Sequence, residues 1–150
     1  MSIKNVSFIG LGVMGYPMAG HLQNKGYNVT VYNRTTAKAE KWVEEYKGSM
    51  AKTPGEASQN SEIVFMCVGR DEDIIEVMEG EAGILSNVAE GSIIVDHTTA
   101  SAEIARNYYQ KLKDKKLSFL DAPVSGGQAG AELSLIHISE PTRLRRISYA

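Results

Sequence analysis

The sequence predicts an α/β protein with a doubly wound, mainly parallel sheet, and three observations support this prediction. Short runs rich in β-branched and aromatic residues alternate with longer segments that have helical periodicity. The run 62–68 is almost wholly apolar, which is typical of a central parallel strand buried on both faces, and the run 92–96 is predicted to be another buried strand. The first run, 6–9, leads into a helical pattern through the segment Gly10-Leu11-Gly12-Val13-Met14-Gly15. A strand, a glycine loop and a helix in this order are typical of a Rossmann-type fold.

The three glycines of this loop predict a site for the pyrophosphate of a dinucleotide. Gly10 lets the chain turn tightly off the strand, and Gly12 leaves no Cβ where the pyrophosphate must approach the backbone. Gly15 lets the helix pack closely on the strand, and the unpaired N–H groups of the first helical turn face the anion. The same spacing occurs in other nucleotide and cofactor binders, and the simplest alternative is an ordinary glycine-rich turn.

The residues after the second strand predict which dinucleotide binds. A helix over about 13–25 and a strand over 27–32 lead to Asn33-Arg34-Thr35. About 20 residues beyond the glycine loop, NAD-binding domains carry a carboxylate for the adenosine ribose, and none is present here. Asn33 can bond a hydroxyl, whereas Arg34 and Thr35 suit a 2′-phosphate. We therefore expect NADP(H) as the preferred cofactor, with NAD(H) also able to bind; alternatively, Arg34 is a solvated charge and the site is indifferent.

The rest of the chain continues the alternation of helices and strands. Helices are expected at 36–48, from 54, over 74–78 and over 102–113, and strands at 50–53, 62–68, 92–96 and 117–121. Cys67 falls inside one of these strands, which predicts an inert packing residue. The acidic residues 71–73 precede a helix and complement its dipole.

Two segments that follow expected strands offer polar groups to a ligand. In His97-Thr98-Thr99-Ala100-Ser101, one hydroxyl has to cap the next helix, and another is a candidate contact to the nicotinamide ribose. His97 is a candidate acid or base, but a structural role is the simpler interpretation. In Ser125-Gly126-Gly127, exposed backbone N–H groups form a candidate cradle for a carboxylate.

Length and charge restrict the class of partner. The 150 residues have the size of one domain, and the net charge of -2 gives no electrostatic case for nucleic acid, so a small molecule is the expected partner. Cys67 is the single cysteine, no apolar stretch approaches the length of a membrane span, and residues 1–4 lead straight into the first strand. These features predict a cytoplasmic protein without a membrane partner, and no metal site is predicted.

Four motifs together resemble the β-hydroxyacid dehydrogenases, the family of 3-hydroxyisobutyrate dehydrogenase and its relatives. They are residues 10–18 (GLGVMGYPM), Asn33-Arg34-Thr35, Asp96-His97-Thr98-Thr99 and Asp121-Ala122-Pro123-Val124-Ser125-Gly126-Gly127. The resemblance implies an N-terminal NADP-binding domain over residues 1–132, in which the first motif binds the pyrophosphate and Val68-Gly69 runs along the cofactor. It also implies that Thr99 lies by the nicotinamide and that Ser125, Gly126 and Gly127 hold the substrate carboxylate.

The chain departs from the family pattern at two places. Val68-Gly69 stands where many members have Leu-Pro, and His97 replaces a commoner Met or Ser; neither change conflicts with the assignment. A rival with the same fold is 6-phosphogluconate dehydrogenase, which usually has Ala at the place of Gly12. The lead-in Asp121-Ala122-Pro123 also speaks against that rival.

After Glu132 the resemblance stops. The family continues with a helix that carries a catalytic lysine and with an all-helical second domain, whereas residues 133–150 contain no lysine. We therefore expect the C-terminal helical domain to be absent. The tail 133–150 resembles translated sequencing-adapter read-through and is expected not to be native. The alternative is a genuine basic tail with Arg143, Arg145 and Arg146.

The resemblance implies hydride transfer between a nicotinamide and a small hydroxy acid or semialdehyde. The candidate types are 3-hydroxyisobutyrate, 4-hydroxybutyrate with succinic semialdehyde, and glyoxylate. Because no catalytic residue is present, the chain as written is expected to be an inactive fragment, and the full-length form is expected to be a homo-oligomer. The alternatives are a non-catalytic NADP-binding module and a structural or interaction role.

Overall fold

A six-stranded parallel sheet forms the centre of residues 3–123, the part of the chain that the computed structural model describes. In spatial order its strands are β3 (Ser49–Met50), β2 (Asn28–Tyr32), β1 (Asn5–Ile9), β4 (Ile63–Met66), β5 (Ile93–Asp96) and β6 (Ser118–Asp121). Every neighbouring pair in this sheet is parallel. The order 3-2-1-4-5-6 is that of the Rossmann fold, so the predicted fold class is confirmed.

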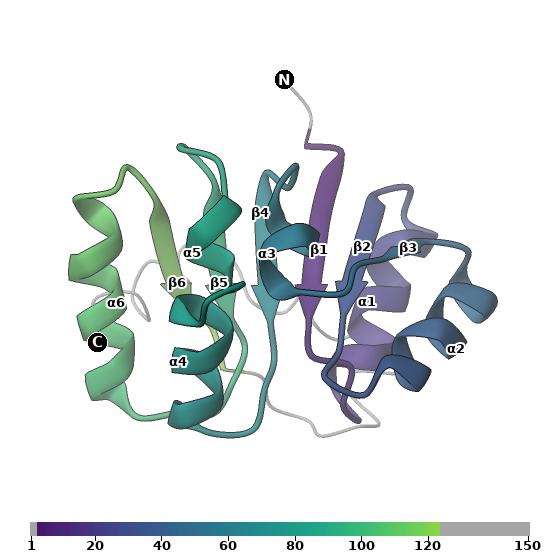
Figure 1. Ribbon diagram of the computed structural model, residues 1–150, viewed down its shortest axis with the longest axis horizontal. Coiled ribbons are helices and arrows are strands. Elements are labelled where there is room, and N and C mark those ends of the chain that lie inside the picture. The colour runs from purple at the N-terminus through teal and green to yellow at the C-terminus, as the bar shows by residue number, and fades with distance from the viewer. Residues whose placement is uncertain (1–2, 124–150) are drawn as a thin grey trace.

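Helices connect the strands and cover the sheet. They are α1 (Gly15–Asn24), α2 (Thr36–Tyr46), α3 (Pro54–Ser58), α4 (Asp71–Glu79), α5 (Ile84–Asn87) and α6 (Ala102–Lys113). Figure 1 shows α3, α4 and α5 in front of the sheet, with β1 starting near the N-terminus at the top and the carboxyl ends of the strands at the bottom. Among the described helices, none is both long and apolar enough to cross a membrane.

The two faces of the sheet carry separate apolar cores. Val64 and Met66 of β4 belong to the core that includes residues of α3 to α6. Their neighbours Ile63 and Phe65 pack against the other core, which is built around Trp42 and residues of α1 and α2. Strand β4 therefore contacts apolar side chains on both faces, as its sequence predicts.

The helix boundaries follow from local signals in the sequence. Ser101 caps α6, because its Oγ accepts the N–H of Ile104 at 3.3 Å, and the helix covers the predicted 102–113. Thr53 caps α3 in the same way through the N–H of Glu56 at 3.1 Å. Gly26, with φ of +101°, follows the end of α1 in a conformation that glycine adopts without strain.

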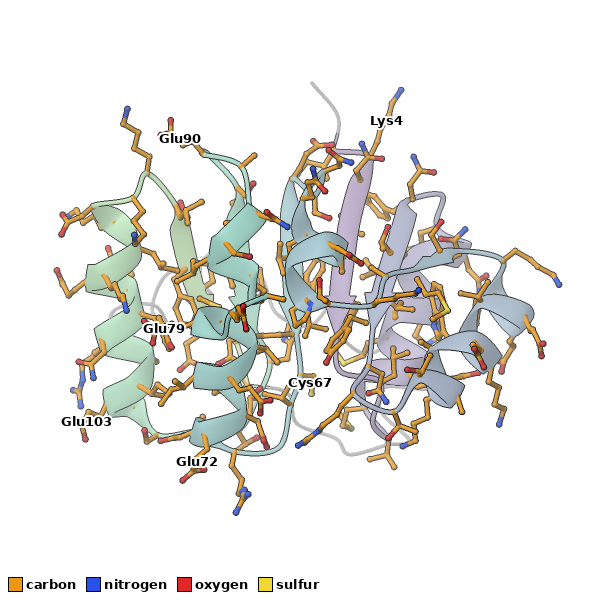
Figure 2. All side chains as sticks on the ribbon, in the orientation of Figure 1. Lys4, Cys67, Glu72, Glu79, Glu90 and Glu103 are labelled. Atoms are coloured by element: carbon orange, nitrogen blue, oxygen red, sulfur yellow. The ribbon has the colours of Figure 1, made fainter. Side chains whose placement is uncertain are left out.

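Four details differ from the sequence predictions. Helix α4 is longer than the predicted 74–78, because it begins at Asp71 and the acidic residues 71–73 form its first turn instead of preceding it. Helix α5 was not predicted, because four residues are too few to show helical periodicity. Strand β3 has two residues, 49–50, rather than the predicted 50–53. Cys67 lies just beyond β4 instead of inside the strand, at the carboxyl edge of the sheet where Glu72 also lies in the first turn of α4 (Figure 2).

Candidate functional site

A cleft of about 610 Å³ opens at the carboxyl ends of β1, β2 and β4. It lies where the connections leave β1 and β4 for opposite faces of the sheet, the place where ligands bind in open α/β folds. Every described residue predicted to bind the cofactor lines it except Leu11 and Thr99. The lining residues among the predicted ones are Gly10, Gly12, Val13, Met14, Gly15, Asn33, Arg34, Thr35, Val68 and Gly69.

Each glycine of the loop has different structural surroundings. Gly10 has φ of +100°, and a Cβ there would lie 2.2 Å from the carbonyl oxygen of Cys67. A Cβ on Gly15 would lie 2.0 Å from the carbonyl oxygen of Gly10. By contrast, a Cβ on Gly12 would have no neighbouring atom within 4 Å and would project into the open cleft. Protein packing therefore requires the first and third glycines, while the second leaves room for a ligand.

No side chain caps the N-terminus of α1, which faces this cleft. The first N–H groups of a helix have no partner within the helix, and the helix dipole adds partial positive charge at the same end. In α1 the N–H of Tyr16 donates to the carbonyl oxygen of Gly12 at 3.0 Å and Pro17 has no N–H, so an anion beside Gly12 would meet the backbone donors that precede Tyr16.

Asn33 holds the glycine loop to the end of β2. Its Oδ1 accepts the N–H of Leu11 at 2.9 Å, and its Nδ2 donates to the carbonyl oxygen of Thr35 at 3.0 Å. The Leu11 side chain is buried beneath the loop, so this residue contributes its backbone rather than its side chain to the site. The observed partners of the Asn33 amide are thus backbone groups of the protein, although the sequence suggested a hydroxyl of the ligand.

Charged side chains of opposite sign line the two walls of the cleft. Arg34, Lys38 and Lys52 come from the side of β2, α2 and β3, whereas Asp73, Glu76 and Glu81 come from α4 and the residues after it. The Arg34 side chain is 76% exposed, and its Nη2 lies 3.6 Å from Oδ1 of Asp73.

Sequence reasoning missed the two lysines and this carboxylate. Lys38 has the pattern of a solvated helix face, and Lys52 lies far from Arg34 along the chain. Asp73 lies in an acidic run that the helix dipole already explains. One feature of the sequence could have indicated that Lys38 lies at the cleft: it follows Asn33-Arg34-Thr35 closely, in the first turn of the next helix.

Thr98 fixes the Val68-Gly69 segment by a hydrogen bond to its backbone. Its Oγ1 accepts the N–H of Val68 at 3.0 Å, and its own N–H donates to Oδ1 of Asp96 at 2.8 Å. Ser101 provides the helix cap, so two of the three candidate hydroxyls have structural roles. Thr99 is exposed and lies outside the cleft lining, and its contact with a nicotinamide ribose stays a prediction. Ser125, Gly126 and Gly127 lie outside the described residues.

Burial shifts the protonation of three groups near the strand ends. Burial raises the pKa of Asp96 to about 6, against the lowering effect of its hydrogen bonds with Thr98. Burial lowers the pKa of His97, whose Nδ1–H donates to the carbonyl oxygen of Ala122 at 2.7 Å and whose ring stacks on Phe65. Burial also raises the pKa of Cys67 to about 11, which keeps it as an unreactive thiol. The geometry of His97 thus supports a structural role.

Two comparisons of sequence identify relatives of this chain. The profile of the family described as "NAD binding domain of 6-phosphogluconate dehydrogenase" matches residues 5–139. The chain is 59% identical over 130 residues to an uncharacterized oxidoreductase of Shewanella frigidimarina, a match that covers 87% of this chain and 45% of the relative. It is 36% identical over 150 residues to "Probable 3-hydroxyisobutyrate dehydrogenase-like 1, mitochondrial" of Arabidopsis thaliana, covering 97% of this chain and 45% of that protein. The chain thus spans about half the length of these relatives.

Solved structures show the same fold. The structure described as Psf3 in complex with NADP+ and 2-OPP is 27% identical, with a TM-score of 0.79 over 85% of this chain and 45% of that one. A structure with the same fold, an imine reductase variant of Myxococcus stipitatus, is in complex with NAD+; it is 20% identical, with a TM-score of 0.77 over 87% of this chain and 43% of that one. Among residues 3–123, no cluster of three or more His, Cys, Asp or Glu could hold a metal ion.

The family profile carries the name of the predicted rival, but the Arabidopsis relative is of the 3-hydroxyisobutyrate dehydrogenase type. The chain belongs to this family of NAD(P)-binding Rossmann domains, and its relatives are 3-hydroxyisobutyrate dehydrogenase-like oxidoreductases.

Proposed function

We propose that the chain is the cofactor-binding part of an NADP-dependent oxidoreductase that acts on a small hydroxy acid or semialdehyde. The substrate is of the 3-hydroxyisobutyrate, succinic semialdehyde or glyoxylate type. One observation carries the cofactor assignment: Arg34 lines the cleft at the end of β2, and no carboxylate occupies that strand end. A guanidinium at this place suits the 2′-phosphate that distinguishes NADP from NAD.

The residues of the cleft fit such a cofactor in two ways. Gly12 and the uncapped start of α1 offer room and backbone donors for the pyrophosphate. Arg34, Lys38 and Lys52 add three cations on one wall, where a phosphate monoester gains charge-assisted hydrogen bonds.

In the proposed reaction the residues of the chain bind and orient, and the nicotinamide supplies or accepts the hydride. Asn33 fixes the glycine loop, and Thr98 fixes Val68, so both sides of the cleft are held in place before the ligand enters. Ser125-Gly126-Gly127 holds the substrate carboxylate, which accepts hydrogen bonds from backbone N–H groups.

The division of the chain is also part of the proposal. Residues 1–132 form the NADP-binding domain, and residues 133–150 are a tail foreign to the family, which places the end of the family sequence seven residues before residue 139, where the match to the family profile ends. The complete protein is a cytoplasmic homo-oligomer whose second domain supplies the lysine that moves the proton. The chain as written binds cofactor without turning over substrate. Oxidation of NADPH by this chain with succinic semialdehyde or glyoxylate would contradict that part of the proposal.

Equilibrium binding tests the cofactor assignment. NADPH and NADH are titrated by nucleotide fluorescence into the parent chain, Arg34→Ala and Lys41→Ala. Lys41 is the matched control, because it is an exposed cation of α2 outside the cleft lining. We expect NADPH to bind more tightly than NADH in the parent and in Lys41→Ala, and the difference to disappear in Arg34→Ala. Equal affinities in the parent would show that Arg34 is only a solvated charge.

A further inference from the structure

Asp73 places a fixed carboxylate on the wall of the cleft opposite Arg34. It belongs to the first turn of α4, and its side chain is only 17% exposed. Its Oδ2 accepts the N–H of Arg70 at 3.0 Å, which caps the helix. Its other oxygen, Oδ1, lies 3.6 Å from Nη2 of Arg34. One carboxylate therefore closes the helix end and pairs with the cation proposed for the 2′-phosphate.

The three acidic residues at the start of α4 have different partners. Asp71 accepts hydrogen bonds from the N–H and Oγ of Ser101, and Glu72 pairs with Arg70 at 3.9 Å. Only Asp73 of the three lines the cleft. Complementing the helix dipole explains why acids occur here, but it does not explain why this one faces Arg34.

Gly69 makes room for the carboxylate of Asp73. A Cβ on Gly69 would lie 2.7 Å from Oδ2 of Asp73, closer than real Cβ contacts allow. A residue with a Cβ at position 69 would therefore require the end of the Asp73 side chain to shift from its observed place.

We propose that Asp73 lowers the preference for NADP over NAD by competing with the 2′-phosphate for the guanidinium of Arg34. This inference rests on the proposed NADP-binding function. Arg34 is exposed and sits on a long flexible stem, so it can turn from one anion to the other, whereas Asp73 is held by its cap. When a 2′-phosphate takes the guanidinium, Asp73 loses its counter-ion and faces a second anion. NAD, which lacks that phosphate, leaves the pair intact, so Asp73 acts on the difference between the two affinities.

The substitution Asp73→Asn tests this competition. Asparagine keeps an oxygen that can accept the N–H of Arg70 and has nearly the same volume, so the cap of α4 is preserved. We expect NADPH to bind about two- to fivefold more tightly, the range expected for one exposed ion pair, with NADH affinity unchanged. The gain should shrink at high salt, because exposed charges are screened.

Two further variants isolate the pair. Glu76→Gln removes another carboxylate of α4 that lines the same cleft and forms no ion pair with Arg34 within residues 3–123, so it should leave the NADPH to NADH ratio unchanged. In an Arg34→Ala background, Asp73→Asn should also have no effect, because the shared partner is gone. Thermal melting verifies that each variant folds, and Asp73→Ser, which keeps a capping oxygen, replaces Asp73→Asn if that variant does not.

The outcomes separate the inference from the function on which it rests. A parent chain that binds neither nucleotide, or binds both equally, would overturn the NADP assignment and the competition together. A parent with an Arg34-dependent preference that Asp73→Asn leaves unchanged or reduces would overturn the competition alone. An equal gain in Glu76→Gln would show that the general negative field of α4, and not this ion pair, sets the preference.

Discussion

At the scale of single residues, Asn33 acts on the cleft without being an anion-binding group. Its amide joins the backbone of Leu11 to that of Thr35, so one side chain fixes the relative position of the glycine loop and the end of β2. A side chain in this role affects every ligand that uses the loop. Arg34, by contrast, is expected to affect only a ligand that carries a 2′-phosphate.

Asn33→Ala is therefore expected to weaken NADPH and NADH binding by the same factor. Loss of the two hydrogen bonds leaves the part-buried N–H of Leu11 without its partner and should lower the free energy of unfolding by about 1–3 kcal/mol. Denaturant unfolding and nucleotide titration measure the two effects. The control is Asn28→Ala, which removes an exposed hydrogen bond to Asn5 outside the cleft lining. A loss confined to NADPH would show that Asn33 binds the phosphate directly.

Asp96 gives a prediction about pH at the same scale. Its pKa is raised to about 6 in the folded chain, so between pH 4 and 6 the folded state keeps a proton that the unfolded state has released. Unfolding then releases a proton, and this group makes the chain less stable as the pH rises through that window. The effect amounts to at most about 3 kcal/mol for a shift of this size.

Asp96→Asn should remove this pH dependence. Asparagine keeps an acceptor for the N–H of Thr98 and carries no proton to release, so its stability relative to the parent should grow from pH 4 to pH 7. Unfolding curves at several pH values measure the difference. Asp114→Asn, at the exposed end of α6, is the control and should show no such growth. A difference that stays constant with pH would mean that Asp96 titrates normally.

At the scale of elements, the glycine loop between β1 and α1 contains one glycine that the fold requires and another that only ligand binding is expected to require. Gly10 has a positive φ and contacts the backbone of Cys67, whereas Gly12 faces open space. Gly10→Ala is expected to destabilise the chain strongly. Gly12→Ala should keep the melting temperature near that of the parent and weaken NADPH binding roughly tenfold or more, because its Cβ fills space that the pyrophosphate needs.

Melting curves and NADPH titrations of these two alanine variants measure the contrast. Gly26→Ala is a third variant with a positive φ but open space around the added Cβ, so it reports the cost of backbone strain without a clash. Unchanged NADPH binding in Gly12→Ala would argue that the pyrophosphate does not approach this position.

Elements with strong local signals could be predicted from the sequence, and those that depend on packing could not. Helix α6 has a serine cap and clear periodicity, and its predicted range is the observed one. Helix α5 has four residues and only tertiary neighbours to define it. In the site, the glycine loop and Arg34 were predictable because strand ends of a parallel sheet meet at one edge. Lys52 and Asp73 were not, because nothing local places them on facing walls of one cleft.

At the scale of the whole molecule, the cleft connects the two apolar cores. Its lining comes from the segments around α1 and α2, which build one core, and from the segments around β4 and α4, which contribute to the other. A ligand that spans it makes contacts with both halves of the sheet. Binding is therefore linked to the stability of the described fold as a unit.

NADPH should raise the melting temperature of the chain, and the rise should keep growing with the logarithm of the NADPH concentration above the dissociation constant. At about one hundred times its dissociation constant, a ligand specific for the folded state adds about 2.7 kcal/mol to the free energy of unfolding. Thermal melts over a range of NADPH concentrations measure this effect, and the same series with Arg34→Ala is the control. A melting temperature that NADPH leaves unchanged would contradict binding to the folded chain.

The central place of β1 also has a consequence for synthesis of the chain. Residues 6–9 pair with β2 on one side and with β4 on the other, yet they leave the ribosome before either partner. The second partner of this strand is missing until residues 63–66 have been made. Until then the nascent chain exposes the apolar side chains and one unpaired edge of β1. A chaperone that binds short apolar segments would therefore find β1 available until β4 has been made.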